Sequence, residues 1–518
     1  MGCKQRAISP FGSFVSIFID FSYFRKIEMD YVSTSALLFS LTCIVTYFVV
    51  SLHARSKNSN YKLPPGPSFF TIMSNVVGLY NKPQQTLAKF AKFYGPVMRI
   101  NLCTETTIII SSSDMAKEIL HTHDSLFTDR SVPHNTTIYN HENLSLVFLP
   151  FSPLWQHLRK VCHNNLFSTK TLNASQELRR VKLKDLLNDM HKSSLTGEAV
   201  DIGRAAFKAC INFLSYSFVS QDFVESLDDE HKDIVSTLLK AIGTPNISDH
   251  FPVLKILDPQ GIKRLTHNYV SKVFFALDII IDKRMKLRES EHYVSNNDML
   301  DALLDISKED TQKMDKKQIK HLLLDLLVAG TDTTAYGLER ALCELVHNPE
   351  IMSKAKTELE ETIGIGNPVD ESDMDRLPYL QAVVKESLRL HPPAPMLLPR
   401  KARVDVEISG YTIPKGAQVL INEWAIGRTD IWEDAHLFSP ERFIGSEIDV
   451  KGQHFKLTPF GSGRRICPGS PLAVRMLHLM LGSLINSFDW KLENNMEFKD
   501  MDMDKSLRAI PVALNKVY

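Results

Sequence analysis

The sequence predicts a mostly α-helical protein with small β-sheets. Along most of the chain apolar residues recur three and four positions apart, the spacing of a helix that buries one face. Short runs rich in β-branched residues occur early and late, and glycine and proline punctuate the later ones as turns. Apolar residues make up 44% of the 518 residues, enough for a sizeable core.

The predicted elements follow in chain order. The early strands cover residues 97–102 and 106–112, and the later ones 404–408 and 418–423. The clearest amphipathic helices cover residues 235–242, 273–285, 319–342 and 471–488.

Charge and motifs exclude several classes of protein. The formal net charge is zero and the basic residues are dispersed, so no nucleic-acid partner is expected. The seven cysteines include no Cys-x-x-Cys pair, which argues against a disulfide framework or a zinc site. No Gly-x-Gly-x-x-Gly follows a strand and no P-loop is present. Any redox chemistry would therefore need electrons from a partner.

The N-terminal region predicts a membrane anchor. Residues 31–52 carry no charge and are long enough to cross a bilayer as a helix, while basic residues follow them. We expect an N-terminal extension of no assigned function over residues 1–28 and a transmembrane signal anchor over 29–53. A basic, proline-rich hinge over 54–67 then leads to the globular domain, 68–518. The alternative for the apolar run is a buried core helix.

One cysteine lies in an unusual loop, residues 459–469, with the sequence PFGSGRRICPG. Cys467 is expected to meet backbone N–H groups, arginine charge and a helix N-terminus, all of which lower the pKa of a thiol. Phe460 can supply an apolar wall, and Arg465 can meet a carboxylate. Glycines let the backbone pass close to a large flat ligand: Gly461, Gly463 and Gly469. The alternative is a buried structural cysteine beside a glycine turn.

This loop matches Phe-x-x-Gly-x-Arg-x-Cys-x-Gly at every fixed position and resembles the haem-binding loop of the cytochrome P450 family. The resemblance implies the cytochrome P450 fold, preceded by an N-terminal transmembrane helix. It also implies haem b with the Cys467 thiolate on the iron. It assigns cofactor contacts to Phe460, Gly463, Arg465 and Gly469.

A second motif, AGTDTT at residues 329–334, interrupts an apolar helix. An acid and an alcohol there are costly unless they act, and the motif resembles the oxygen-activating groove of the same family. Asp332 and Thr333 would be the catalytic acid–alcohol pair. The alternative is a threonine that bonds back to its own helix. Beyond the motif, residues 335–341 (AYGLERA) depart from the SSTLEWA of related plant enzymes.

Two further patterns resemble family motifs. Glu386 and Arg389 lie one helical turn apart, and with Arg442 they would form a buried network behind the haem. The remaining group would contact the haem propionates, with a core tryptophan and surface arginines as the alternative: Trp155, Arg159, Arg130, Arg400 and Arg465. Residues 131–148, the helix before Gly330 and residues 394–398 should face a pocket for a lipophilic substrate.

Together, these motifs resemble a plant microsomal cytochrome P450 from residue 29 onward, and other segments resemble the geraniol 8-hydroxylase group. The implied function is an oxidoreductase, a haem–thiolate monooxygenase that hydroxylates a monoterpenol or other terpenoid. It would use O2 and electrons from NADPH–cytochrome P450 reductase. The implied location is the endoplasmic reticulum membrane, single-pass, with the haem domain facing the cytosol.

The C-terminal region departs from that group. Asp502-Met503-Asp504-Lys505-Ser506 runs directly into Leu507-Arg508, whereas relatives carry a substrate-lining hairpin of about ten residues between these segments. This departure keeps a non-catalytic form open, and two other functions are considered in all. One is a haem–thiolate isomerase or dehydratase, which needs neither O2 nor a reductase. The other is a non-catalytic paralogue or isoform.

Overall fold

The computed structural model describes residues 61–102, 105–221, 234–244, 246–296, 298–309, 314–493 and 507–514. The chain divides into Met1–Tyr61 and Lys62–Tyr518. The predicted N-terminal extension and transmembrane anchor lie outside the described residues. Among the described residues, no helix combines the length and the apolar character that crossing a membrane requires.

The second unit is mostly helical with small sheets, as predicted. Its α-helices are α4 Phe69–Ser74, α5 Val76–Asn81, α6 Pro83–Tyr94, α7 Ser113–Lys117, α8 Pro153–Val161, α9 Thr169–Ala174, α10 Gln176–Thr196, α11 Ile202–Val219, α12 Ile234–Gly243, α13 Ile247–His250, α14 Ile262–Leu287, α15 Met299–Glu309, α16 Lys316–His347, α17 Pro349–Thr362, α18 Pro378–Leu390, α19 Glu423–Ile426 and α20 Ser470–Ser487. Its strands are β1 Val97–Leu102, β2 Glu105–Ile110, β3 Asp129–Arg130, β4 Val200–Asp201, β5 Arg400–Lys401, β6 Val406–Ile408, β7 Tyr411–Ile413, β8 Gln418–Ile421, β9 Phe488–Leu492 and β10 Arg508–Ala513.

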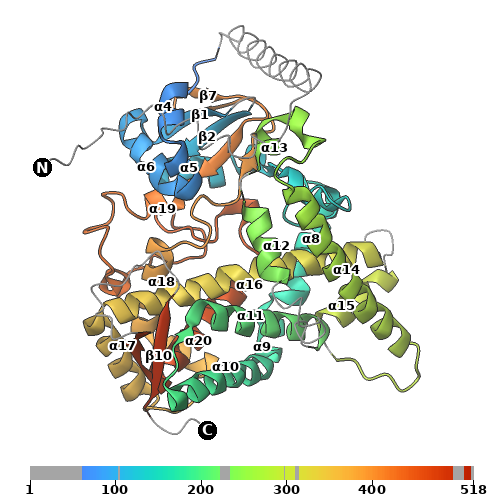
Figure 1. The fold of residues 1–518 in the computed structure, drawn as a ribbon, viewed down its shortest axis with the longest axis vertical. Coiled ribbons are helices and arrows are strands. Elements are labelled where there is room, and N and C mark those ends of the chain that lie inside the picture. Colours follow the sequence, from blue (N-terminus) through green and yellow to red (C-terminus); the bar gives the residue numbers. More distant parts are fainter. Residues whose placement is uncertain are drawn as a thin grey trace, which may run out of the picture. The chain divides into compact units, whose positions relative to one another are not determined.

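Helix α16 crosses the middle of this unit, and α11, α18 and α20 pack along it (Figure 1). It begins where the Asp315 side chain accepts a hydrogen bond from the Gln318 N–H at 2.6 Å. Its leucine-rich sequence is buried because neighbouring helices cover it. At Gly330 an added Cβ would come within 2.8 Å of Leu214, so the missing side chain admits α11.

The strands form three sheets. The largest has the order β1-β2-β8-β5-β3, in which β2 and β8 run parallel and the other pairs run antiparallel. The second has the order β4-β10-β9, and β6 pairs with β7. The largest sheet places Arg130 opposite Arg400, since β3 pairs with β5 at these residues.

The described end of the hinge, residues 62–67, is attached to the sheets. The Pro65 carbonyl accepts a hydrogen bond from the Arg99 N–H of β1, and the Lys62 carbonyl accepts one from Thr412 of β7. Gly66 lies so close to the Arg99 carbonyl that a Cβ would come within 1.8 Å of its oxygen. This part of the hinge is therefore packed against the domain and is not a free spacer.

The departure at residues 335–341 leaves α16 unbroken as far as His347. Gly337 packs against Leu477 of α20, where an added Cβ would lie 3.2 Å from the leucine. Glu339 accepts a hydrogen bond from the Leu507 N–H at 2.9 Å. The altered sequence thus forms specific contacts with α20 and with the residue before β10.

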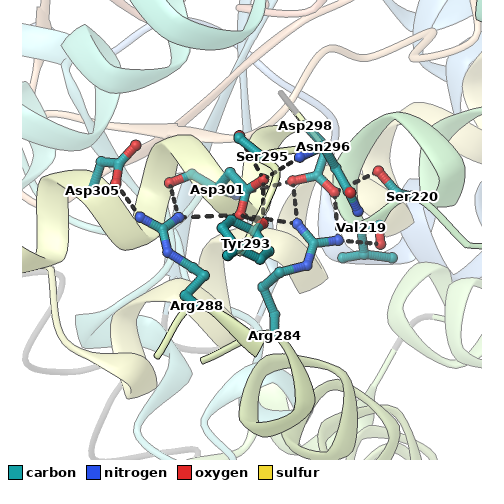
Figure 2. Close-up of polar contacts among 10 residues, drawn as sticks. All are labelled: Val219, Ser220, Arg284, Arg288, Tyr293, Ser295, Asn296, Asp298, Asp301 and Asp305. Atoms are coloured by element: carbon teal, nitrogen blue, oxygen red, sulfur yellow. Dashed lines mark hydrogen bonds and ion pairs between the residues drawn. The ribbon is translucent and has the colours of Figure 1, made fainter. Parts of the chain in front are cut away.

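A buried ion-pair network closes the junction of α11, α14 and α15 (Figure 2). Arg284 donates to both oxygens of Asp298, at 2.9 and 2.8 Å, and to the Val219 carbonyl. Arg288, one turn along α14, donates to Asp301 at 3.1 Å. Burial alone would raise the pKa of the Asp301 carboxyl, but hydrogen bonds from Tyr293 and Ser295 and the Arg284 cation lower it to about 2. The network fixes the ends of three helices.

We predict that Asp298→Ala destabilises the domain by about 3–5 kcal/mol, because Arg284 is left buried without its main partner. The measurement is the urea midpoint of unfolding, followed by tryptophan fluorescence. Asp305→Ala is the control, since that carboxylate is 65% exposed at the outer end of the network. Its loss should cost about 1 kcal/mol or less, and equal shifts for the two variants would contradict the prediction.

Candidate functional site

A cavity of about 430 Å³ lies between α16 and the loop that carries Cys467. All three segments expected to face a pocket contribute to its lining: residues 131–148, the part of α16 before Gly330, and residues 394–398. Apolar side chains of α11, α12, α14 and α20 line it as well, which the sequence did not predict. The lining is mainly apolar and suits a lipophilic ligand.

The cysteine loop forms one wall of this cavity. Cys467, Phe460, Gly461 and Gly469 all line it. The Cys467 N–H donates to the Phe460 carbonyl at 2.9 Å, which folds the loop back on itself. Gly461 has a φ of +70°, a conformation that residues with a Cβ rarely adopt. Helix α20 begins directly after the loop, at Ser470.

Hydrogen bonds from the Gly469 and Ser470 N–H groups and the charge of Arg159 lower the pKa of the Cys467 thiol, as expected. In the protein alone, burial outweighs them and raises this pKa. A metal ion on the sulfur would reverse this balance, because a coordinated thiol is deprotonated outright.

Gly463 does not line the cavity, contrary to the expected cofactor contact. It has a φ of +70°, and an added Cβ would come within 2.2 Å of the Leu120 carbonyl and 2.8 Å of Asp124. Gly463 therefore permits the backbone at Leu120 to approach the cysteine loop closely.

Helix α16 contributes four residues of the AGTDTT motif to the cavity lining: Ala329, Gly330, Thr333 and Thr334. The Thr333 hydroxyl donates to the Ala329 carbonyl at 2.7 Å, so the local back-bond and the cavity position occur together. Asp332, which precedes Thr333, is not one of the residues that line the cavity. Burial raises the pKa of its carboxyl.

Four arginines gather at the cavity wall: Arg130, Arg159, Arg400 and Arg465. Burial lowers the pKa of each guanidinium, and that of Arg465 falls to about 10. The charges of Arg400 and Arg465 lower the pKa of Arg130 further, and within the described residues the buried Arg130 Nε has no hydrogen-bond partner. Cations this crowded fit an anionic ligand. The two carboxylates of a haem would supply that charge, with Cys467 on the same cavity for its iron.

Trp155 occupies the cavity wall without the free N–H that was expected. Its indole N–H donates to the Leu146 carbonyl at 3.0 Å. The Arg465 guanidinium lies 4.3 Å from the centre of the indole ring and donates to the same carbonyl at 3.3 Å. The tryptophan therefore orients Arg465 through its ring face, and its N–H fixes the neighbouring loop.

Asp124 is a functional residue that the sequence did not indicate. Its carboxylate accepts hydrogen bonds from Arg400 at 3.0 Å and from the side chain and backbone of Arg464 at 3.0 Å. Arg400 also donates to the Ser462 carbonyl. Asp124 thereby attaches the cysteine loop to the large sheet.

The structure brings Glu386, Arg389 and Arg442 together. Arg389 donates to both oxygens of Glu386, at 2.7 and 2.8 Å, and both side chains are fully buried. Arg442 donates to Glu386 at 3.0 Å, and the Ser439 N–H donates at 2.8 Å. Arg389 also reaches the Gly427, Ala435 and Leu437 carbonyls. The network therefore ties α18 to the segment that precedes the cysteine loop.

Sequence reasoning also missed two buried acids. Asp325 of α16 lines the cavity in contact with His141 and Ser145. Glu423 accepts hydrogen bonds from the backbone and hydroxyl of Thr458, next to the cysteine loop, and burial raises its pKa to about 7. Asp325 had a usable signal, because it is an acid within a leucine run.

The C-terminal end contributes little to the cavity. Among the described residues, no lining residue follows Leu477. Strands β9 and β10 pair directly, with Ala509 opposite Leu492, and residues 494–506 between them lie outside the described part of the chain.

Comparisons with known proteins agree with this architecture. The cytochrome P450 family model matches residues 64–515. Geraniol 8-hydroxylase of Catharanthus roseus is 45% identical over 501 residues, which cover 94% of this chain and all of that protein. Drimenol monooxygenase of Persicaria hydropiper is 44% identical, covering 92% of this chain and 94% of the relative. A zebrafish cytochrome P450 solved with progesterone has the same fold, with a TM-score of 0.69 at 21% identity over 83% of this chain and 99% of that one.

We predict that Glu386→Ala abolishes haem assembly. Removing this carboxylate leaves Arg389 fully buried and unpaired, which costs about 3–5 kcal/mol. The measurement is the reduced carbon-monoxide difference spectrum per milligram of expressed protein.

Glu441→Ala is the control for this prediction, since Glu441 is an exposed neighbour of Arg442 that pairs with Lys354 at the surface. It should retain the thiolate-type Soret band. An unchanged band in Glu386→Ala would contradict the assigned role of the network.

Proposed function

Because this chain belongs to the cytochrome P450 family and is a haem–thiolate monooxygenase, we propose that its substrate is a terpenoid, in the first place a monoterpenol. The relatives named above are described as acting on geraniol and drimenol. The observation that carries the proposal is the mainly apolar cavity bounded by Cys467 and Thr333.

The residues of the chain have distinct tasks in this reaction. Bound haem supplies the oxygen-activating chemistry, by which one atom of O2 enters a C–H bond and the other leaves as water. Cys467 would hold its iron, and the arginines at the wall would hold its carboxylates. The Thr333 hydroxyl donates a hydrogen bond to the Ala329 carbonyl, so its lone pairs remain available to accept another hydrogen bond. Asp332 adjoins Thr333 on α16 and would pass protons toward that hydroxyl, and burial raises the pKa of its carboxyl.

The electrons come from NADPH–cytochrome P450 reductase in this proposal, because the sequence carries no nicotinamide or flavin motif of its own. We place the protein on the endoplasmic reticulum membrane, with residues 29–53 as the anchor and the haem domain in the cytosol. Support comes from the uncharged run in that segment and from exposed apolar side chains such as Phe70, Val77 and Ile256.

The first test is turnover. Microsomes that contain the chain and the reductase should convert geraniol to a hydroxylated product only when NADPH and O2 are both present. The activity should remain in the membrane pellet after a carbonate wash. Turnover without NADPH and O2 would indicate an isomerase or dehydratase. A normal carbon-monoxide spectrum without turnover of any terpenoid would indicate a non-catalytic form.

We predict that Thr333→Val yields at least about tenfold less product per NADPH consumed, because proton delivery in the groove is lost. Thr331→Val is a matched control on the same helix. Its hydroxyl makes the same kind of back-bond, to Leu327 at 2.7 Å, but it is buried away from the cavity. The control should couple NADPH to product as the wild type does, and equal losses in the two variants would contradict the role of Thr333.

A further inference from the structure

Glu423 is a buried acid that the oxygen chemistry described above does not use. It is the first residue of α19 and is only 3% exposed. Its carboxylate accepts hydrogen bonds from the Thr458 N–H at 2.5 Å and from the Thr458 hydroxyl at 2.8 Å. Both donors belong to the residue that directly precedes the cysteine loop, so this carboxylate holds the loop where it begins.

Thr458 starts the turn that leads into the cysteine loop. Its carbonyl accepts a hydrogen bond from the Gly461 N–H at 2.8 Å, and the Phe460 carbonyl accepts one from the Cys467 N–H at 2.9 Å. Thr458 is fully buried. Because these bonds follow one another along the loop, the position of Thr458 affects the backbone at Cys467.

Helix α19, on the other side of this contact, is attached to the rest of the domain. The Asn422 N–H donates to the Ile110 carbonyl of β2 at 2.7 Å, and the Asn422 side chain donates to the Gln84 carbonyl of α6 at 2.9 Å. The Trp424 N–H donates to the Pro395 carbonyl at 3.1 Å. The carboxylate therefore joins a fixed helix to the cysteine loop.

No cation balances this carboxylate among the described residues. Burial raises the pKa of Glu423 to about 7, the hydrogen bonds from Thr458 lower it, and no charged group contributes. The ionisable groups on the neighbouring segments are all at least partly exposed to solvent: Lys89, Lys92 and Tyr94 of α6, Arg428 after α19, and His454 and Lys456 before the loop. Glu423 therefore changes its charge near neutral pH.

The contact with Thr458 survives protonation. In the acid form, one oxygen of Glu423 still accepts from the Thr458 N–H, and the carboxyl O–H donates to the Thr458 hydroxyl oxygen. If the contact opened and water reached the carboxyl, the pKa would fall from about 7 toward its ordinary value of 4.5. The closed contact thus holds the proton more tightly. Its stability is fully present below pH 4.5 and is lost as the pH rises through about 7.

We propose that Glu423 is a positioning residue for the cysteine loop: as the acid it keeps the loop closed on α19, and as the carboxylate it lets the loop open. The haem–thiolate site thereby depends on pH through one residue that does not line the cavity. This inference does not depend on the identity of the substrate.

The experiment follows the carbon-monoxide complex of the purified, reduced holoprotein at pH 6 and at pH 8. Conversion of its thiolate-type Soret band to the shifted band of a lost thiolate reports opening of the loop. We expect the wild type to convert about tenfold faster at pH 8, because the stabilisation by the Glu423 proton falls by about that factor between these pH values.

Glu423→Gln shows whether this pH dependence originates at Glu423. The amide is neutral at both pH values, its oxygen can accept from the Thr458 N–H, and its nitrogen can donate to the Thr458 hydroxyl. The two conversion rates should therefore become equal. Glu407→Gln is the control, since it makes the same chemical change at an exposed residue of β6. It should keep the wild-type ratio of rates.

Thr458→Val gives a second, independent result. It removes the hydroxyl whose hydrogen bond lowers the pKa of Glu423, so the midpoint of the pH dependence should move to higher pH. A residue with a purely structural role would not shift that midpoint.

Equal rates in the wild type at the two pH values, or a ratio that survives in Glu423→Gln, would overturn the inference. If Glu423→Gln does not assemble its haem, the midpoint in Thr458→Val decides, and an unchanged midpoint would overturn the role of Glu423. No substrate is added in these measurements. The terpenoid proposal can therefore fail while this inference stands, and the reverse.

Discussion

The rest of the domain depends on how it buries guanidinium groups. An arginine removed from water must be paired or hydrogen-bonded on every side, and the chain meets this demand by joining distant segments. Arg389 does so with Glu386 and three carbonyls behind the cysteine loop, and Arg284 with Asp298 at the junction of three helices. Arg179, which is fully buried, pairs with Glu371 in the same way. Each pair fixes the relative position of the backbone segments that it joins, because hydrogen bonds are directional and apolar packing is not.

The arginines of the cavity obey the same constraint only in part. Arg400 has Asp124, and Arg465 has main-chain carbonyls, but positive charge still exceeds negative charge around the chamber. The lowered pKa values of these guanidinium groups and the raised pKa of the Cys467 thiol have one origin, since burial opposes charge in both cases. The arginines would hold the two carboxylates of a bound haem and Cys467 its metal ion, which would relieve both costs together. Binding of the cofactor would accordingly also raise the free energy of unfolding of the domain.

The sequence predicts the elements that leave a periodic signal, and the structure has them. Helix α16 contains all of residues 319–342, and α20 contains the predicted helix 471–488 except its last residue, because a helix that buries one face repeats its apolar residues with the helical period. Other features depend on tertiary packing and leave no such signal. The bond between Asp124 and Arg400 joins residues 276 positions apart. Two further features exist only in the folded chain. One is the close approach of Gly463 to the Leu120 carbonyl, and the other is the burial that raises the pKa of the Cys467 thiol.

The peptide at Leu146 has one further consequence. Its N–H is bound to Asp325, the acid that faces the ligand, and its carbonyl is bound to both Trp155 and Arg465. A displacement of this single peptide unit when the chamber fills would alter the hydrogen bonding of the Arg465 guanidinium on the chamber wall. The acid that faces the chamber and the guanidinium on its wall are therefore linked mechanically, and neither can shift without straining the hydrogen bonds of the other.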